Sequence, residues 1–354
     1  MTGGEASGSR TGGERTAYLV LGMHRSGTSA VTQLLSLAGA RLPANVMPGD
    51  EYNQQGYFEP WKIAILNDER LRAAGSAWDD GFAFPFRPLA ADDEALWSER
   101  ARALFAEEYG RVRHPLMKDP RVTVLLPFWR KVLERQGVGA RCVIPVRHPL
   151  AVAGSLQRRD GFPPEKSVLV WTAYMLAAEA YTRDLPRAFV AYDALLADWR
   201  GQVARIEAAH GAPLPKLDEK AARRIDQALS PDLRHNAGGG DLSGLGWSGD
   251  LAARVLDWFE AAARDGRPAR RILDEAAAEM GRRAAEMGPL VSPAARDLDV
   301  ARTGLIEARR RAEHLEDVLT RQQPDLEAGW RARSALAAVE AELDAALAGE
   351  DPKS

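Results

Sequence analysis

The sequence is short of cysteine, of long apolar runs and of net charge. Its 354 residues include one cysteine, so no disulfide can form within the chain. No run approaches the roughly 18 apolar residues of a membrane-spanning helix, and residues 1–15 lack the apolar middle of a signal peptide. A net charge of −3 creates no field that would attract nucleic acid. We therefore expect a cytoplasmic protein that binds neither a membrane nor nucleic acid.

Short apolar runs alternate with longer segments of helical periodicity over most of the chain. Buried strands are predicted at residues 18–21, 141–146 and 188–192. Helices are predicted at residues 29–39, from 60, at 92–109, from 149 and at 167–185. This alternation predicts an α/β fold, a P-loop-like three-layer domain in which helices flank a parallel sheet. Its expected extent is residues 17–290, after a disordered leader at residues 1–16.

Residues 291–354 form a helical tail of different character. Apolar residues recur at three- and four-residue steps in two groups, Leu305, Ala308, Ala312, Leu315 and Leu319, then Leu336, Val339, Leu343 and Leu347. Such heptad-like spacing is typical of a coiled coil, but Pro324 and Gly329 interrupt it. We expect two short helices, which pack as a hairpin, against a partner such as a second copy, or back onto the domain.

Residues 22–29 have the G-x-x-x-x-G spacing of a phosphate-binding loop, between a predicted strand and a predicted helix. ATP-binding loops continue with a lysine that reaches the β- and γ-phosphates, whereas this sequence continues with Thr28. Backbone N–H groups and the positive end of the helix can still hold a phosphate. A cation, Arg25, lies inside the loop instead.

The predicted strand at residues 141–146 is followed by Arg147. Nucleoside triphosphatases usually place an aspartate at such a strand end to hold Mg²⁺. An arginine there, together with the absence of Cys/His spacing typical of zinc sites, predicts no metal site. The two arginine-bearing loops instead favour a ligand with two separated phosphates.

These two loops carry a resemblance to a known family. The segment Arg25-Ser26-Gly27-Thr28-Ser29 resembles the 5′-phosphosulfate loop of sulfotransferases that use 3′-phosphoadenosine 5′-phosphosulfate, in the arginine version of tyrosylprotein sulfotransferases and many bacterial members. Arg147 and Ser155, eight residues apart, resemble the 3′-phosphate pair of that family. Residues 56–60 and 118–121 resemble recurring segments of its bacterial branch. The resemblance covers residues 17–290 and excludes the tail.

The resemblance implies a role for each residue of the two loops. Arg25 is expected to stabilise the charge that grows on the leaving 5′-phosphate. The donors to that phosphate are expected to be Ser26, Gly27, Thr28 and Ser29. Arg147 and Ser155 are expected to hold the 3′-phosphate, for which the planar fork of a guanidinium is suited. No metal is expected to take part.

Glu59 is the preferred general base, with Lys118 near the transferred sulfuryl group. The rival bases are His114, Asp119 and His148, while His24 is expected to be structural. The acceptor would be a hydroxyl of a small molecule or carbohydrate, against which the aromatic side chains of residues 78–86 could pack if they do not belong to the core. Two other functions stay open. They are a P-loop kinase or nucleotide-binding protein, and an inactive binding or scaffold protein of the same fold.

Overall fold

The computed structural model describes residues 15–49, 56–229 and 239–349, with side chains as far as residue 344. The chain divides into two compact units, Met1–Arg296 and Asp297–Ser354. Residues 1–14 of the expected leader lie outside the described residues, and Thr16 begins the first strand. No helix of the described ranges is both long enough and apolar enough to cross a membrane.

The first unit is built on a four-stranded sheet. The strands are β1 (Thr16–Val20), β2 (Leu116–Lys118), β3 (Gly139–Val146) and β4 (Arg187–Ala191). Their order in the sheet is β2-β1-β3-β4, and each neighbouring pair is parallel. The predicted parallel α/β fold is thus confirmed. Because all four strands run the same way, the loops that follow them leave from one edge of the sheet.

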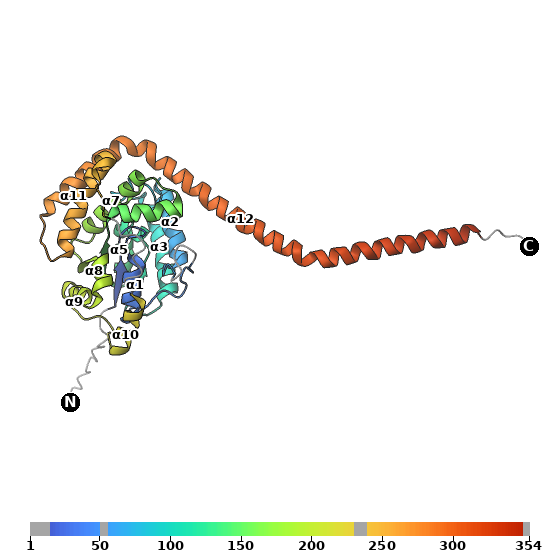
Figure 1. Ribbon diagram of the computed structural model, residues 1–354, viewed down its shortest axis with the longest axis horizontal. Helices are drawn as coiled ribbons and strands as arrows, with labels where there is room; N and C mark the ends of the chain where they lie inside the picture. The colour runs from blue at the N-terminus through green and yellow to red at the C-terminus, as the bar shows by residue number, and fades with distance from the viewer. Residues whose placement is uncertain (1–14, 50–55, 230–238, 350–354) are drawn as a thin grey trace, which may run out of the picture. The chain divides into compact units, whose positions relative to one another are not determined.

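Both faces of the sheet are buried, as the apolar runs required. Along β1, Leu19 packs into one core cluster, whereas Tyr18 and Val20 pack into the other, because successive side chains point to opposite faces. Figure 1 shows the strands enclosed by helices of this unit. One face is covered by α1 (Thr28–Leu37), α8 (Tyr192–Ala197), α9 (Trp199–His210) and α10 (Glu219–Ala228).

The opposite face carries the larger core. It is covered by α2 (Trp61–Ala73), α3 (Ala91–Tyr109), α4 (Arg121–Val124), α5 (Leu126–Arg135), α6 (Pro149–Asp160), α7 (Pro164–Ala180) and α11 (Gly246–Ala263). A short 3₁₀ turn, η2 (Ser243–Leu245), precedes α11. Trp129 and Trp171 are among the fully buried side chains here. Each such apolar side chain stabilises the fold by about 1.5–3 kcal/mol through its removal from water.

One helix, α12 (Arg270–Gly349), contributes to both units. In the first unit Leu273, Ala276 and Met280 pack into the larger core. The helix continues through Pro324 and Gly329, so the prediction of two short helices is wrong. A proline costs a helix about 3 kcal/mol and can be absorbed without ending it. Long runs of Ala, Arg, Glu and Leu, which are strong helix formers, flank both residues and outweigh that cost.

Gly39 closes the turn after α1 and offers a test of this packing. Its φ is +97°, and an added Cβ would lie 2.8 Å from Lys216 Cβ and 2.9 Å from the Lys216 backbone nitrogen. We expect Gly39→Ala to lower the free energy of unfolding by about 2 kcal/mol or more, through strain and backbone collision together. Gly75→Ala is the control, because its φ is +72° but its Cβ would meet nothing. That variant should lose only about 1 kcal/mol. Equal losses in denaturant titrations would contradict the crowding at Gly39.

Candidate functional site

The loop at residues 22–29 connects β1 to α1. The Thr123 hydroxyl accepts a hydrogen bond from Gly22 N at 2.8 Å and donates one to Gly22 O at 3.3 Å, which fixes the start of the loop. A turn from Met23 O to Ser26 N follows. Arg25 is in the left-handed region with φ 67°, an uncommon conformation for a residue with a side chain. Such strained backbone is frequent where a loop must present its groups to a ligand.

The start of α1 presents hydrogen-bond donors. Gly27 precedes the helix with no side-chain cap, and the first turn contains no acidic residue. Gly27 has φ 92°, and a Cβ there would lie 2.3 Å from the ring of Tyr192, so only glycine fits. The hydroxyl oxygen of Ser26 is buried and has no hydrogen-bond partner among the described residues. An uncapped helix N-terminus with such a hydroxyl beside it suits an anion.

The second predicted loop lies against the first. Arg147 Nη1 donates to the carbonyl oxygen of Arg25 at 2.9 Å, and Arg25 Nε donates to Ser155 Oγ at 2.7 Å. The Arg147 guanidinium also lies 4.6 Å from the ring centroid of Tyr192, a cation–π contact. Burial lowers the pKa of Arg147, while Tyr192 and Asp193 act in the opposite direction. The structure therefore brings Arg25, Arg147 and Ser155 together.

A buried ionic cluster contains the two other candidates. Lys118, at the end of β2, donates to Glu59 Oε1 at 2.6 Å and to Tyr57 O at 2.9 Å. Arg121 Nη1 lies 3.5 Å from Glu59 Oε2 and 2.8 Å from Asp119 Oδ1. Each charge thus faces an opposite charge, which a buried ion requires. Glu59 and Lys118 are 3% and 2% exposed, so their contact is shielded from water. The sequence did not predict this pair.

Arg121 is the centre of this cluster. Burial by itself would lower its pKa, but the carboxylates of Asp68, Asp119 and Glu59 outweigh burial and raise the pKa well above the ordinary value. The contact between Arg121 Nε and Asp68 Oδ1 is 2.5 Å. Asp119 is held from its other side by Asn67 Nδ2 at 2.7 Å. Arg121 lies in the segment 118–121, and the sequence predicted no role for it.

His24 belongs to the loop at residues 22–29 and lies near the cations of the ionic cluster. Burial lowers its pKa well below the ordinary value, and the nearby cations Arg121, Arg159, Lys118 and Arg25 lower it further. The imidazole is therefore neutral at pH 7. Its Nε2 is buried with no hydrogen-bond partner among the described residues. The ring lies 4.8 Å from that of Trp78. A structural role was expected for His24, and its packing against Trp78 is consistent with such a role. The cations near the ring show that His24 also lies beside the candidate site.

The three rival bases have different surroundings. His114 precedes β2 and so lies at the opposite edge of the sheet from the two loops, with its ring 6.2 Å from Tyr18. His148 caps α6, because its Nδ1 accepts from Leu150 N at 3.2 Å. Both oxygens of Asp119 accept hydrogen bonds from Asn67 and Arg121. Arg234 and His235, which the sequence suggests could close over the nucleotide, lie outside the described residues.

The aromatic segment at residues 78–86 divides between core and site. Phe82 and Phe84 are buried in the larger core, and the partly buried Phe86 packs against it. Trp78 is half-buried, and its ring stacks on that of Phe162 with centroids 5.6 Å apart. The Arg159 guanidinium lies 5.5 Å from the Trp78 ring centroid. Only Trp78, which also contacts His24, remains a candidate for acceptor binding.

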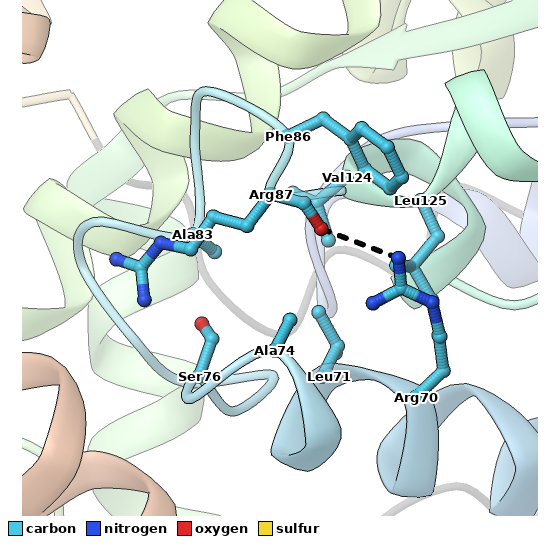
Figure 2. Close-up of a pocket in the computed structure, with 9 residues that line it drawn as sticks. All are labelled: Arg70, Leu71, Ala74, Ser76, Ala83, Phe86, Arg87, Val124 and Leu125. Atoms are coloured by element: carbon cyan, nitrogen blue, oxygen red, sulfur yellow. Dashed lines mark hydrogen bonds between the residues drawn. The ribbon is translucent and has the colours of Figure 1, made fainter. Parts of the chain in front are cut away.

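A separate hollow lies between α2, the segment after it and α4 (Figure 2). It measures about 230 Å³ including the part open to solvent and is lined by Arg70, Leu71, Ala74, Ser76, Ala83, Phe86, Arg87, Val124 and Leu125. Arg70 is fully buried, and its Nη2 donates to Glu94 Oε2 at 2.6 Å and to Arg87 O at 3.2 Å. The hollow shares no residue with the two loops. Its ion pair and its small size indicate a packing defect, with room for water, next to a structural arginine.

The described residues contain no group of three or more His, Cys, Asp or Glu side chains arranged to hold a metal ion. The one cysteine, Cys142, lies in the middle of β3 and is fully buried. Burial raises the pKa of its thiol to about 12. The thiol is therefore protonated and unreactive at neutral pH.

Comparisons with solved structures give distant similarities. No protein-family model matches the chain, and no curated protein matches it. The solved sulfotransferase domain of the Synechococcus PCC 7002 olefin synthase is 17% identical, covering 76% of this chain and 95% of that chain, with a TM-score of 0.37. The sulfotransferase domain from the curacin biosynthetic pathway is 15% identical, covering 68% of this chain and 97% of that chain, with a TM-score of 0.38. Similarities this low do not assign a function, which depends on the residues of the site itself.

The low pKa of His24 makes stability depend on pH. The unfolded chain binds a proton near pH 6.5, whereas the native imidazole resists protonation. Above pH 6.5 this histidine therefore costs the native state no free energy. As the pH drops below 6.5, the free energy of unfolding falls by up to about 1.4 kcal/mol per pH unit for this one proton. We expect His24→Gln to reduce that slope between pH 6.5 and 5 in denaturant titrations. His114, His148 and His210 also have lowered pKa values, so part of the slope should remain. An unchanged slope would contradict a neutral His24.

Proposed function

We propose that the protein is a sulfotransferase that moves a sulfuryl group from 3′-phosphoadenosine 5′-phosphosulfate to a hydroxyl of a small molecule or carbohydrate. The observation that carries the proposal is the contact between the two loops. The Arg25 side chain donates a hydrogen bond to Ser155 Oγ at 2.7 Å, and the Arg25 backbone carbonyl accepts one from Arg147 Nη1. Residues expected to hold the two ends of one nucleotide are therefore neighbours, although 130 residues separate Arg25 from Ser155.

The two phosphates of the sulfate donor would contact different groups of the protein. The N–H groups at the start of α1 and the hydroxyl of Ser26 suit the 5′-phosphate, because they are uncapped and without partners among the described residues. Arg147 suits the 3′-phosphate, because a guanidinium has five N–H donors and can bind an anion beside its present contacts. Ser155 adds a hydroxyl there. Arg25, Arg147 and Lys118 would supply the positive charge that faces the donor.

The transfer step needs a base on one side of the sulfur and a cation on the other. The acceptor oxygen forms a bond to sulfur while the bond from sulfur to the bridging oxygen of the 5′-phosphate breaks. The electron pair of that bond stays on the phosphate, where Arg25 stabilises the new charge. The acceptor proton passes to the carboxylate of Glu59.

Lys118 would serve both Glu59 and the group in transfer. An ammonium has three N–H donors. Two of them are used on Glu59 Oε1 and Tyr57 O, which leaves one for an oxygen of the sulfuryl group. The same contact fixes the orientation of the Glu59 carboxylate. Positioning of this kind contributes most of the acceleration in phosphoryl transfer, and sulfuryl transfer presents a similar problem.

Binding of the donor site can be measured with 3′,5′-diphosphoadenosine by calorimetry in the absence of metal. We expect Arg147→Ala to bind at least about tenfold more weakly, since a hydrogen bond to a charged partner contributes about 1.5–3 kcal/mol. Arg141→Ala is the matched control, because Arg141 is a half-buried arginine near the other end of the same strand, β3. Its affinity should equal that of the parent protein.

Two results would contradict the donor site. One is tighter binding of ATP with Mg²⁺ than of 3′,5′-diphosphoadenosine, which would favour a kinase or triphosphatase. The other is equal weakening by Arg147→Ala and Arg141→Ala, which would mean that the loop after β3 does not contact the nucleotide.

The base can be tested with radiolabelled donor and a panel of hydroxyl acceptors. We expect Glu59→Gln to lower kcat by about 10²–10⁴-fold with little change in donor affinity, because the amide cannot accept the proton. Glu108→Gln is the control, since Glu108 is equally buried but accepts from the backbone and side chain of Asn45. Donor binding without transfer to any acceptor in the parent protein would support an inactive binding protein instead. An unchanged kcat in Glu59→Gln would reject Glu59 as the base.

A further inference from the structure

The second unit presents an apolar seam along its helix. Leu305, Leu315 and Leu319 are 53%, 54% and 60% exposed. They belong to a series with steps of three and four residues, Leu305, Ala308, Ala312, Leu315, Leu319 and, after the polar Gln322, Leu326. Because α12 is continuous through this stretch, all of these positions lie on one stripe of the helix. We call this set of residues the tail seam.

The spacing of the tail seam is that of a coiled coil. With Leu305, Ala312, Leu319 and Leu326 at the a positions, Ala308, Leu315 and Gln322 occupy the d positions. A strict alternation of three and four residues keeps the stripe facing a partner helix over the whole length. A helix that folds back onto a globular surface needs a wider apolar face than this two-in-seven pattern. The pattern therefore points to another helix as the partner.

The charges beside the seam fit a second copy of this chain as the partner. Arg311 lies at a g position and Glu316 at the following e position. Both side chains are exposed, and neither forms an ion pair in the part of the chain that the structure describes. In a parallel coiled coil, a g residue faces the e residue of the next heptad in the partner. Two copies in register would therefore form this ion pair twice.

The antiparallel arrangement is disfavoured by the polar residue of the seam. There, a positions face d positions, so full overlap of two copies of the tail seam would put Gln322 opposite Leu305 of the partner subunit. A buried amide that faces an apolar side chain is destabilising. In the parallel, in-register arrangement Gln322 instead faces its own copy, and two amides can bond to each other. The polar seam position and the Arg311–Glu316 pair together favour a second copy of this chain in the parallel orientation.

We propose that the tail seam is the interface of a parallel, in-register dimer, in which Arg311 of one chain pairs with Glu316 of the partner subunit. Gln322 then lies opposite Gln322 of the partner subunit. A polar residue at one seam position is a known means of fixing register, because any shift would bury it against a leucine. The inference depends on the second unit alone and not on the function proposed for the first.

The test is the mass of the full-length protein by sedimentation equilibrium, with variants that reverse one charge each. The parent protein should be a dimer at micromolar concentration. Arg311→Glu and Glu316→Arg should each raise the dissociation constant of the dimer about fivefold or more, because each variant sets like charges face to face twice. An equimolar mixture of the two variants should recover the parental affinity, since the mixed dimer has an opposite-charge pair on both sides.

Two further variants complete the experiment. Leu315→Asp should give a monomer, because it puts a charge into the seam. Arg310→Glu is the control, since Arg310 lies on the outer side of the helix at an f position, and its mass should equal that of the parent. A monomeric parent, a dimer that Leu315→Asp leaves intact, or a mixture that binds no better than either charge variant alone would overturn the proposal.

Discussion

The parallel pairing of β1 with β3 is the constraint on which the candidate site depends. Five residue pairs, from Thr16 with Gly139 to Val20 with Val143, set the two strands in the same direction and register. Each strand therefore delivers its following loop to the same edge of the sheet. Arg25 and Arg147 meet there as a direct consequence. β4 ends at the same edge, and Tyr192, the residue that follows it, fills the space beside Gly27 and under Arg147.

The ionic cluster next to the loops is expensive to bury. Removal of a carboxylate or ammonium from water costs several kcal/mol even after relaxation, and replacement of buried ion pairs by apolar residues is often neutral or stabilising. Here Glu59, Lys118, Asp119 and Arg121 are mutually paired, and Trp129 Nε1 donates to Asn67, which holds Asp119. A buried ionic cluster is therefore weak evidence for a purely stabilising role. The proposed transfer would require a carboxylate and a cation held in fixed orientation, which this cluster supplies in Glu59 and Lys118.

Local patterns predicted much of this structure, and long-range contacts account for what they missed. The strands β1, β3 and β4 and the loop at residues 22–29 follow from short apolar runs and glycine spacing, and they lie close to where they were expected, whereas β2 was not predicted. The pairing of Glu59 with Lys118 joins segments 59 residues apart and had no local signal. His114 looked as good a base as any other histidine until the direction of β2 placed it at the far edge. The break expected at Pro324 does not occur, because strong helix formers on both sides outweigh one lost hydrogen bond.

The sequence by itself determined the α/β class, the position of the loop at residues 22–29 and the spacing of the tail seam. Each of these is built from short local patterns, apolar runs, glycine spacing and three- and four-residue steps, and local sterics and periodicity decide such patterns. Only the tertiary structure decided which charged groups stand together. In the folded chain Arg25 bonds to Ser155, and Glu59 contacts both Lys118 and Arg121. His24 lies near four cations. These contacts arise from strand order and helix packing, which bring distant segments together in a way that no local pattern encodes.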